Sequence, residues 1–536
     1  MNFGDTMSVK LNLNNKIVIS RDDQAFIPTR DLLTIVEKEL NVGKQYDREL
    51  RRYKTKYNAV DVTKYLYEID SENLYVPYGL YKYIKYLFKN SKCTYCGNKE
   101  HPIMQTVDIV DNIEKYRGIL PGIELYDNQL EAVKRIFQYK RGVIQAATGF
   151  GKTEIMCAVI QIMKEMNGGH YPTILVLEPT IELLKGIEKR FKKYKIPVNN
   201  YRDTRMISTG KVNLAHPISL VNDLGKNNKV LNKVEVQFMD EAHHSGCDTW
   251  CEPGYNMPNL MYSIGLSATF LSHYHVNGTH LDDFNFNELK RIGTLGPVIM
   301  KVDGDELIEN NQLATPKLCI LHNPANEEMD ETKVDYSWHN VRKIRMQSDY
   351  RTELIAKSAV IFAKQGYKVI ILMNILDWGR KIMKSIYDLG YGDLARTCFG
   401  GSKYERCNRK TGRIEKEFNS TLQLFDKDKI KIIIGSSCIQ EGIDLSRVDV
   451  CILAQGGKSD RTTLQSVGRA LRRSKTGNFS WIVDFDDSDD KMLNKQYRER
   501  MIKYKKVLGL HSSDEVFKKL TISELEEIFK KYENIK

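Results

Sequence analysis

The sequence predicts an α/β protein with two tandem domains, each built around a parallel sheet. Short apolar segments of strand length alternate with segments of helical apolar spacing from about residue 120 to residue 490. A glycine-rich turn joins one of these strands directly to a helix. At 536 residues, the chain is long enough for three or four domains. The expected strands cover residues 173–177, 234–239 and 261–266 in the first domain and 368–373, 429–434, 448–453 and 479–485 in the second.

Changes in periodicity predict four regions along the chain. A small α+β N-terminal domain occupies residues 1–118, the two parallel-sheet domains occupy 119–305 and 306–490, and a helical tail occupies 491–536. In the N-terminal domain, a strand is expected at 16–20, and apolar residues at 32, 33, 36 and 40 predict a helix over 30–40. Residues 304–335 have little periodicity and are expected to form a connector, whereas 491–506 predict a basic helix.

The glycine-rich turn predicts a phosphate-binding site. It follows the apolar run at 142–145 and leads into a helix that is expected to start at Lys152. Backbone N–H groups and the positive end of the helix dipole would point at bound phosphates. Lys152 would add a point charge, and the Thr153 hydroxyl would hold Mg²⁺. The residues expected to surround the phosphates are Ala147, Thr148, Gly149, Phe150, Gly151, Lys152 and Thr153.

Two adjacent carboxylates, Asp240 and Glu241, follow the predicted strand at 234–239. Open α/β sheets bind their ligands at the carboxyl ends of the strands, where this pair is expected to lie. We expect Asp240 to hold Mg²⁺ through water, and Glu241 to orient and deprotonate an attacking water molecule. An acidic surface turn is the alternative, and the phosphate-binding turn upstream argues against it.

A third group of candidate residues lies in the segment 465–472, which begins with Gln465. Arg469 and Arg472 are three residues apart and would share one face of a helix. Phosphoryl transfer builds negative charge on the γ-phosphate oxygens, which an inserted arginine stabilises. Because this segment lies roughly three hundred residues from the phosphate-binding turn, two domains would have to close on one nucleotide.

Taken in order, these motifs resemble those of superfamily 2 helicases of the DExH type, over residues 120–490. The resemblance implies two RecA-like domains, with ATP and Mg²⁺ as cofactors. It also implies that Gln129 reads adenine, that Asp444 contacts the nucleotide, and that His243 senses the γ-phosphate. Residues 267–269 would then link hydrolysis to domain movement. The implied nucleic-acid contacts are Pro179, Thr180, Thr209, Gly210 and Ser436.

Within that superfamily, residues 74–80, 312–316 and 457–473 resemble segments of the phage UvsW-type helicases, which remodel branched DNA. The resemblance implies a monomeric DNA helicase or translocase of phage recombination, repair or replication, acting in the host cytoplasm. Its DNA would be branched, or duplex with single-stranded regions, and its partners would be recombination or single-strand-binding proteins. The residues after Thr269 lack the Pro and Arg that commonly follow this motif. Three alternatives stay open: an RNA helicase, the motor subunit of a restriction complex, and a catalytically inactive nucleic-acid clamp.

The charge of the chain favours a polyanionic partner. Its 81 Lys and Arg exceed its 69 Asp and Glu, which gives a formal net charge of +12 and a pI near 8.9. Residues 44–92 carry 11 Lys and Arg against 6 Asp and Glu, and residues 46–95 hold 11 of the 29 tyrosines. Basic and aromatic residues interleaved in this way suit nucleic acid. The alternative is that these tyrosines pack the core of the N-terminal domain.

The remaining sequence features concern cysteine and the membrane. Ten scattered cysteines are typical of a reducing compartment. Cys93 and Cys96, with His101 nearby, resemble half of a zinc site, but a structural zinc needs four ligands, which disfavours it. No apolar stretch approaches eighteen residues, and the first residues lack the pattern of a secretory signal. We therefore expect no membrane span and an intracellular protein.

Overall fold

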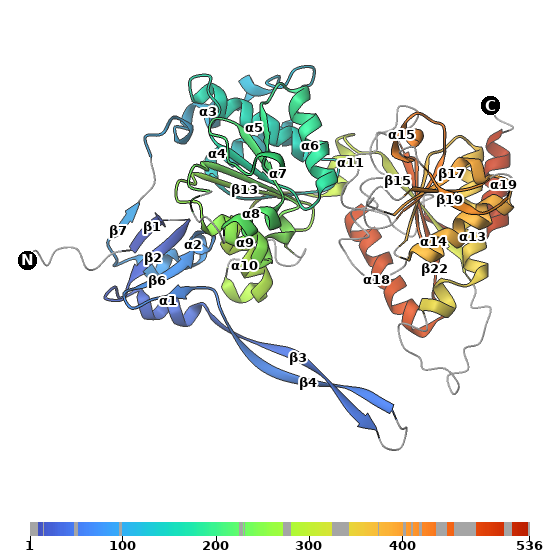
Figure 1. Cartoon of the computed structure of the whole chain (residues 1–536), viewed down its shortest axis with the longest axis horizontal. Coiled ribbons are helices and arrows are strands. Elements are labelled where there is room, and N and C mark those ends of the chain that lie inside the picture. Colours follow the sequence, from blue (N-terminus) through green and yellow to red (C-terminus); the bar gives the residue numbers. More distant parts are fainter. Residues whose placement is uncertain are drawn as a thin grey trace, which may run out of the picture. The chain divides into compact units, whose positions relative to one another are not determined.

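The computed structural model confirms an α/β fold with two parallel-sheet domains (Figure 1). The chain forms two compact units, one made of residues 1–146 and 151–301 and the other of 147–150 and 302–536. The structure describes residues 9–13, 15–47, 52–95, 99–224, 229, 231–271, 280–323, 342–373, 375–399, 404–408, 411–417, 421–435, 448–454, 479–508 and 517–533.

The first unit contains a seven-stranded sheet in the order β10-β11-β9-β12-β13-β8-β14. Neighbouring strands from β10 to β8 run parallel. Parallel sheets are covered on both faces, which explains why nearly every residue of the central strands is buried, including the polar residues Gln145, Gln237 and Ser263. The strands are β8 (Arg141–Ala146), β9 (Ile174–Leu177), β10 (Val198–Asn200), β11 (Val212–Ala215), β12 (Val236–Asp240), β13 (Tyr262–Ser267) and β14 (Val298–Val302).

Helices alternate with these strands, as the sequence predicts. The predicted helix after the glycine-rich turn is α5, which buries eight of its fifteen residues. Its apolar residues cover nearly the whole circumference, which is typical of a helix packed between other elements. The helices of this sheet are α4 (Asp127–Tyr139), α5 (Lys152–Met166), α6 (Ile181–Lys193), α7 (Tyr201–Thr204), α8 (Pro217–Leu224), α9 (Asp248–Tyr255) and α10 (Phe286–Leu295).

The N-terminal region packs on the seven-stranded domain and shares its hydrophobic core. Gly79 lies so close to α10 that a Cβ atom there would collide with the carbonyl oxygen of Ile292. The Asn15 side chain donates a hydrogen bond to the carbonyl of Gly254, with Nδ2 2.8 Å from the oxygen. The predicted strand at 16–20 is confirmed as β2. The sheet has the order β5-β6-β2-β1-β7, formed by β1 (Val9–Leu13), β2 (Lys16–Ser20), β5 (Glu68–Ile69), β6 (Asn73–Pro77) and β7 (Cys93–Tyr95).

The helix predicted over residues 30–40 is wrong. Helix α1 (Phe26–Leu32) ends early, and the chain continues as β3 (Thr34–Asp47), which pairs antiparallel with β4 (Arg52–Tyr65). The apolar spacing that indicated one helix combined the last residue of α1, Leu32, and the next residue, Leu33, with two residues of the following strand. β-branched residues are frequent in both strands, at positions 34–36, 42, 60, 62 and 63, and they favour extended backbone.

The second unit contains a nine-stranded sheet in the order β19-β18-β17-β20-β16-β21-β22-β15-β23. Strands from β17 to β23 run parallel, whereas β18 pairs antiparallel with β17 and β19. The four strands predicted for this domain are confirmed as β16, β20, β21 and β22. The strands are β15 (Thr315–His322), β16 (Val369–Leu372), β17 (Ala395–Cys398), β18 (Tyr404–Cys407), β19 (Ile414–Lys416), β20 (Ile432–Gly435), β21 (Val450–Leu453), β22 (Phe479–Asp486) and β23 (Phe517–Leu520).

Two segments at the borders of this unit contain more structure than the sequence predicts. The expected connector 304–335 contains α11 (Gly304–Glu309) and the sheet strand β15. The buried run at 318–321 is too short to show a period, which is why it was not recognised. The basic helix predicted at 491–506 is confirmed as α18 (Lys491–Leu508), and the tail also supplies β23 and α19 (Ile522–Glu533). The other helices are α13 (Asp349–Lys364), α14 (Leu376–Asp388) and α15 (Thr421–Asp426).

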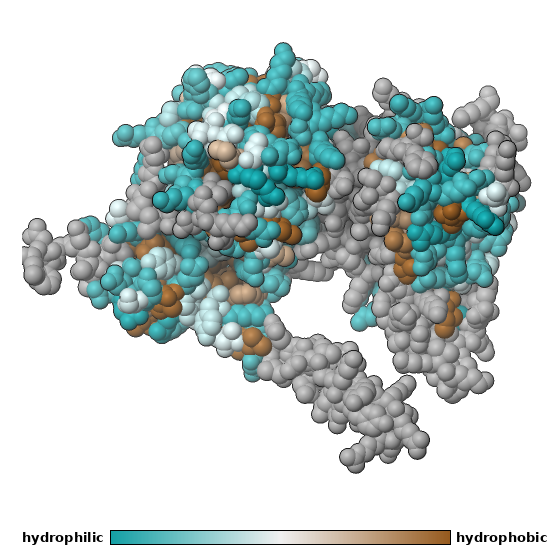
Figure 2. Space-filling view, viewed as in Figure 1, coloured by the Kyte–Doolittle hydropathy of each residue, from teal (hydrophilic) through white to brown (hydrophobic). Residues whose placement is uncertain are grey.

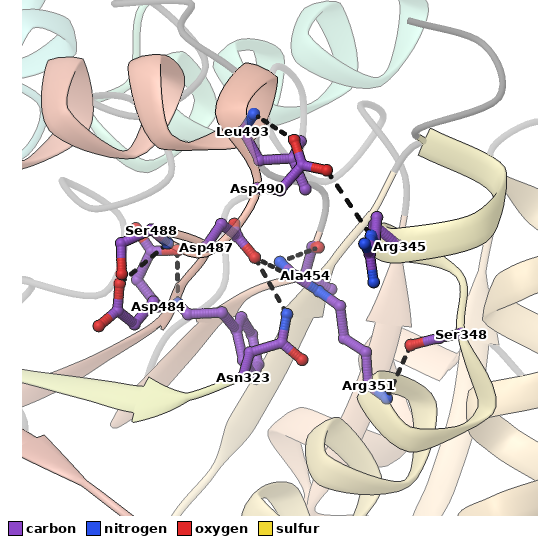
Figure 3. Close-up of polar contacts among 12 residues, drawn as sticks. Asn323, Arg345, Ser348, Arg351, Ala454, Asp484, Asp487, Ser488, Asp490 and Leu493 are labelled. Carbon is purple, nitrogen blue, oxygen red and sulfur yellow. Dashed lines mark hydrogen bonds and ion pairs between the residues drawn. The ribbon is translucent and has the colours of Figure 1, made fainter. Parts of the chain in front are cut away.

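A buried polar network joins the tail helix α18 to the sheet. Arg500 on α18 donates from Nε to a carboxylate oxygen of Asp484 on β22 at 2.8 Å, and the Tyr504 hydroxyl donates to the same oxygen at 3.0 Å. Nearby, Arg351 pairs with Asp487 and donates to the carbonyl of Ala454, the residue after β21 (Figure 3). Because these charged groups are almost fully buried, α18 belongs to the core of the second unit.

The described surface is mostly hydrophilic on the face drawn in Figure 2, with hydrophobic residues in small groups. Among the helices that the structure describes, none combines the length and the apolar character needed to cross a membrane.

We predict that Arg500→Met destabilises the second unit by about 3–5 kcal/mol, because it leaves the Asp484 carboxylate buried without its cation. Adding Asp484→Asn should recover a large part of this loss, since the buried charge is then absent. Urea unfolding followed by tryptophan fluorescence measures both values. A double variant as unstable as Arg500→Met alone would contradict this account of the network.

Candidate functional site

The register of the first sheet places two predicted motifs at one edge. β13 lies between β8 and β12, with Ser267 opposite Gln145 and Leu266 opposite Asp240. Since all three strands run parallel, the end of β8 at Ala146 and the end of β12 at Asp240 lie at the same carboxyl edge, one strand apart. Ligands of open α/β sheets bind at this edge.

The glycine-rich turn requires its glycines. Gly149 and Gly151 have φ angles of 94° and 87°, in the left-handed region that favours glycine. Gly151 directly precedes α5, and a Cβ atom there would collide with the side-chain amide nitrogen of Gln129. Gln129 is itself held in place, because its Oε1 accepts a hydrogen bond from the backbone N–H of Tyr126 at 3.0 Å. The structure thus brings the residue expected to read adenine against the start of α5.

The residues around the start of α5 suit a bound polyphosphate. Lys152 and Thr153 occupy the first turn of a fifteen-residue helix, whose N-terminal N–H groups attract anions. The Lys152 ammonium donates to the Ala146 carbonyl at 3.0 Å, so it lies at the end of β8. The acidic residue in this turn, Glu154, pairs with Arg190 of α6, which offsets its repulsion of a phosphate. These donors fit the triphosphate of ATP, with Thr153 and Asp240 as oxygen ligands for the water shell of Mg²⁺.

The second motif forms a tight turn after β12. Glu241 adopts a left-handed conformation with φ 48°, and its N–H donates to a carboxylate oxygen of Asp240 at 2.9 Å. The Nδ1 atom of buried His243 lies 3.3 Å from Glu241 Oε2 and 3.2 Å from the Ser267 hydroxyl. That hydroxyl in turn accepts from the Thr269 N–H at 3.2 Å. The structure therefore joins the Asp-Glu-Ala-His turn to the segment 267–269 through His243.

Carboxylates crowd this edge of the sheet. Burial, followed by the charge of Glu241, raises the pKa of Asp240 to about 6, against the opposing effects of the Lys152 charge and the Glu241 N–H. Glu178, the residue after β9, is fully buried, and neither of its carboxylate oxygens has a hydrogen-bond partner among the described residues. Burial is the main cause that raises the pKa of Glu178 well above its usual range, followed by the charges of Asp240 and Glu241. A cation bound among these groups would favour their ionised forms.

Sequence reasoning did not single out Glu178. The sequence does contain a signal for it: Glu178 is an acidic residue that stands directly between the apolar run 174–177 and Pro179. An acidic residue directly after a buried strand of a parallel sheet lies at the ligand-binding edge.

The predicted nucleic-acid contacts divide between the two edges of the sheet. Pro179 follows β9, and its carbonyl lies 3.0 Å from Nε2 of His216, the residue after β11. Thr180 uses its hydroxyl to cap α6, accepting from the Leu183 N–H at 3.2 Å. These residues lie at the carboxyl edge.

Thr209 and Gly210 precede β11, and the Gly210 N–H donates to the Thr173 hydroxyl before β9 at 3.3 Å. They therefore lie at the amino edge, and the structure does not bring them together with Pro179 and Thr180. His216, which the sequence analysis did not single out, lies at the carboxyl edge beside Pro179. The sequence signal that could have located His216 is its position between the end of a buried strand, β11, and Pro217, a proline in the first turn of helix α8.

Several predicted residues lie outside the described part of the chain. Ser436 directly follows the last residue of β20, and Asp444 lies in the same undescribed segment. Gln465, Arg469 and Arg472 lie in the segment that begins just after Ala454. Cys96 of the weighed zinc site is also outside, whereas Cys93 lies in β7 and His101 Nε2 is 3.3 Å from a carboxylate oxygen of Glu235.

Two family models match the chain in the same order as its two sheets. The model described as "Type III restriction enzyme, res subunit" matches residues 122–272, and "Helicase conserved C-terminal domain" matches residues 365–474. Together with the fold, these two matches define an ATP-dependent superfamily 2 helicase or translocase that acts on nucleic acid and has the ATPase activity of that superfamily.

Individual relatives are distant. The DNA 3'-5' translocase XPB2 of Sulfurisphaera tokodaii is 23% identical over 66% of this chain and 79% of its own. The ATP-dependent DNA helicase uvsW of Enterobacteria phage T4 is 21% identical over 68% of this chain and 69% of its own. The solved structure of S. cerevisiae Dbp5 bound to RNA and ADP BeF3 has a TM-score of 0.51 at 14% identity, covering 78% of this chain and 96% of its own, and shows similarity of fold. At these identities, the chain is similar to several branches of the superfamily.

Glu178 provides a test of the electrostatics. A buried acid whose pKa is raised in the folded state lowers stability as pH rises from its unfolded value, near 4.3, to its folded value. The loss is about 1.4 kcal/mol for each pH unit in that range. We predict that Glu178→Gln stabilises the protein at pH 8 and has much less effect at pH 5. Chemical unfolding at both pH values measures the difference, with exposed Glu252→Gln as the control. An equal effect of Glu178→Gln at both pH values would show that the carboxyl is not buried as described.

Proposed function

We propose that this chain is an ATP-driven DNA helicase or translocase of the UvsW type, which unwinds or branch-migrates DNA at forks or junctions. The observation that carries the proposal is the carboxyl edge of the first sheet, which holds the start of α5, the Asp240–Glu241 turn and the Pro179–His216 pair. A nucleotide site and a nucleic-acid surface on neighbouring strands suit a protein that converts hydrolysis into movement. The net charge of +12 and the two relatives named as acting on DNA favour DNA.

On the nucleotide side, Gln129 would bind adenine, and the first turn of α5 would bind the phosphates. Asp240 and Thr153 would orient Mg²⁺, which when bound neutralises the phosphate charge. Glu241 would accept a proton from the attacking water, since its residue follows Asp240 in the tight turn and its carboxylate is held 3.3 Å from His243 Nδ1. His243 would pass the state of the γ-phosphate to Ser267, with which it is in contact.

The second parallel-sheet domain would complete the site. We assign Arg469 and Arg472 to the γ-phosphate, where they would stabilise the charge that builds up in the transition state. Gln465 and Asp444 would contact the same nucleotide. On the first domain, nucleic acid would lie against Pro179, Thr180 and His216. On the second, it would lie against the loop at Ser436.

The biological setting follows from the UvsW resemblance. We propose a monomeric motor of phage recombination, repair or replication, with recombination or single-strand-binding proteins as partners. An RNA helicase is the second candidate, because the solved Dbp5 structure of similar fold is bound to RNA. Phosphate contacts alone do not separate the two nucleic acids, and contacts to the 2′-hydroxyl would.

We expect Lys152→Ala and Glu241→Gln each to lower ATP turnover about 10²–10³-fold, the scale of losing one transition-state contact. Lys152→Ala should also weaken ATP binding, whereas Glu241→Gln should bind ATP and fail to hydrolyse it. Phosphate release and nucleotide binding measure the two effects. Exposed Lys189→Ala on α6 is the matched control. Near-normal ATP turnover in both Lys152→Ala and Glu241→Gln would contradict the assignment of these residues to the ATP-hydrolysis site.

The substrate is tested by ATP hydrolysis with matched single-stranded DNA, duplex DNA, a four-way junction and RNA. We expect the junction to stimulate turnover most and Lys152→Ala to abolish the stimulation. Stronger stimulation by RNA than by any DNA would show that the substrate is RNA rather than DNA, without contradicting the proposed ATP-driven motor activity.

A further inference from the structure

Strands β3 and β4 form a long two-stranded ribbon that extends away from the five-stranded sheet (Figure 1). Each strand has 14 residues, and they pair without a register shift from Thr34 opposite Tyr65 to Asp47 opposite Arg52. A two-stranded ribbon is at best marginally stable in water by itself. A ribbon of this length therefore suggests a binding partner.

The base of the ribbon is fixed to the first parallel-sheet domain. Glu37 on β3 accepts a hydrogen bond from the Phe286 N–H at 2.8 Å, at the start of α10. Lys64 on β4, which pairs with Ile35, contacts the same two residues, with its ammonium 3.1 Å from a Glu37 oxygen and 5.2 Å from the Phe286 ring centre. Thr34 and Tyr67 add a hydroxyl pair at 3.2 Å. The direction of the ribbon is thus set by the domain that carries the nucleotide site.

The register separates two kinds of residue in the distal part of the ribbon. Residues of a strand alternate between faces, and directly paired residues share a face. Tyr46 pairs with Tyr53, Lys44 with Thr55 and Val42 with Tyr57, which places all three tyrosines, together with Lys44, on one face. The opposite face carries Arg52, Lys54 and Lys56, paired with Asp47, Gln45 and Gly43.

The size and charge of this part suit nucleic acid. The described residues 42–47 and 52–57 include the basic residues Lys44, Arg52, Lys54 and Lys56 and one acidic residue, Asp47. From Glu37 to Asp47 the ribbon extends roughly 34 Å at about 3.4 Å for each residue. That length is about one helical turn of B-form DNA, and a two-stranded ribbon fits the width of its major groove.

We infer that the distal ribbon binds nucleic acid at a fork, where a duplex opens into single strands. The basic face contacts phosphates of the duplex, and the tyrosine face stacks on bases that the opening exposes. An intact duplex offers no free base faces, and a single strand offers no groove, so the two faces together select the junction between them. This inference deepens the proposed function and rests on it for the substrate, which it narrows to a forked nucleic acid.

The test uses the 536-residue chain without nucleotide. Leu40 and Ala59 face each other in register, so replacing residues 41–58 with an Asn-Gly turn removes the distal ribbon and keeps its anchored base. Two triple variants separate the faces: Tyr46, Tyr53 and Tyr57 to Ser, and Arg52, Lys54 and Lys56 to Gln. The control triple changes the exposed residues Lys82, Lys85 and Lys89 to Gln, which removes the same charge from the same domain.

Fluorescence anisotropy measures binding to a forked duplex, a blunt duplex and a single strand over a range of salt concentrations. We expect the ribbon deletion and both triples to weaken fork binding about tenfold or more relative to the control triple. The basic triple should reduce the slope of log affinity against log salt concentration by the amount expected for about three lost phosphate contacts. The tyrosine triple should leave this slope unchanged. ATP turnover without nucleic acid should stay at the wild-type level in every variant.

Fork affinity and salt dependence equal to those of the control triple would overturn the inference. So would a deletion that leaves fork binding intact and converts a dimer to a monomer by light scattering, because the ribbon edge would then pair with a second copy. Failure of the proposed function can be distinguished from failure of this inference. The former would appear as ATP turnover that survives Lys152→Ala or Glu241→Gln, whereas the binding test uses no ATP.

Discussion

The parallel register of β8, β13 and β12 is the constraint on which the nucleotide site depends. It sets Ala146, Ser267 and Asp240 at one edge of a buried sheet, so the start of α5 and the Asp240–Glu241 turn are brought close together without long side chains. After two of these strands the chain passes through residues with positive φ, which are Gly149 and Gly151 after β8 and Glu241 after β12. The strain of a non-glycine residue there is held by the Asp240 hydrogen bond and by His243.

The same edge is electrostatically costly in the described structure. Asp240 and Glu178 both have raised pKa values, chiefly because they are buried, and each is raised further by neighbouring carboxylates. Such crowding is destabilising by itself and becomes favourable when a cation joins it, which is the expected condition of a site that takes up a metal–nucleotide complex. Glu178 also connects two surfaces, because it directly precedes Pro179 at the candidate nucleic-acid surface.

The sequence predicted the parts whose signals are local. The buried strand β9 is an unbroken apolar run, and the turn before Lys152 has its own glycine pattern, so both could be located in advance. The helix at 30–40 failed because its spacing mixed the end of α1 with the start of β3, and only pairing with β4 resolves the two. Thr209 and Gly210 were placed by motif order, which carries no information about the edge of a sheet. His216 and Glu178 become visible only when strand direction is known.

Helix α10 explains how the N-terminal region and the nucleotide site belong to one mechanical body. Its Thr294 hydroxyl donates to the Ser245 carbonyl, two residues from His243, and Arg291 donates to the carbonyl of Phe270, next to Thr269. At its other contacts, the same helix meets the backbone at Gly79 and binds the ribbon base through Phe286. A displacement of the hydrolysis motifs that moves α10 must therefore move the ribbon with it. Under the proposed function, nucleic acid bound by the ribbon would therefore move together with the first parallel-sheet domain.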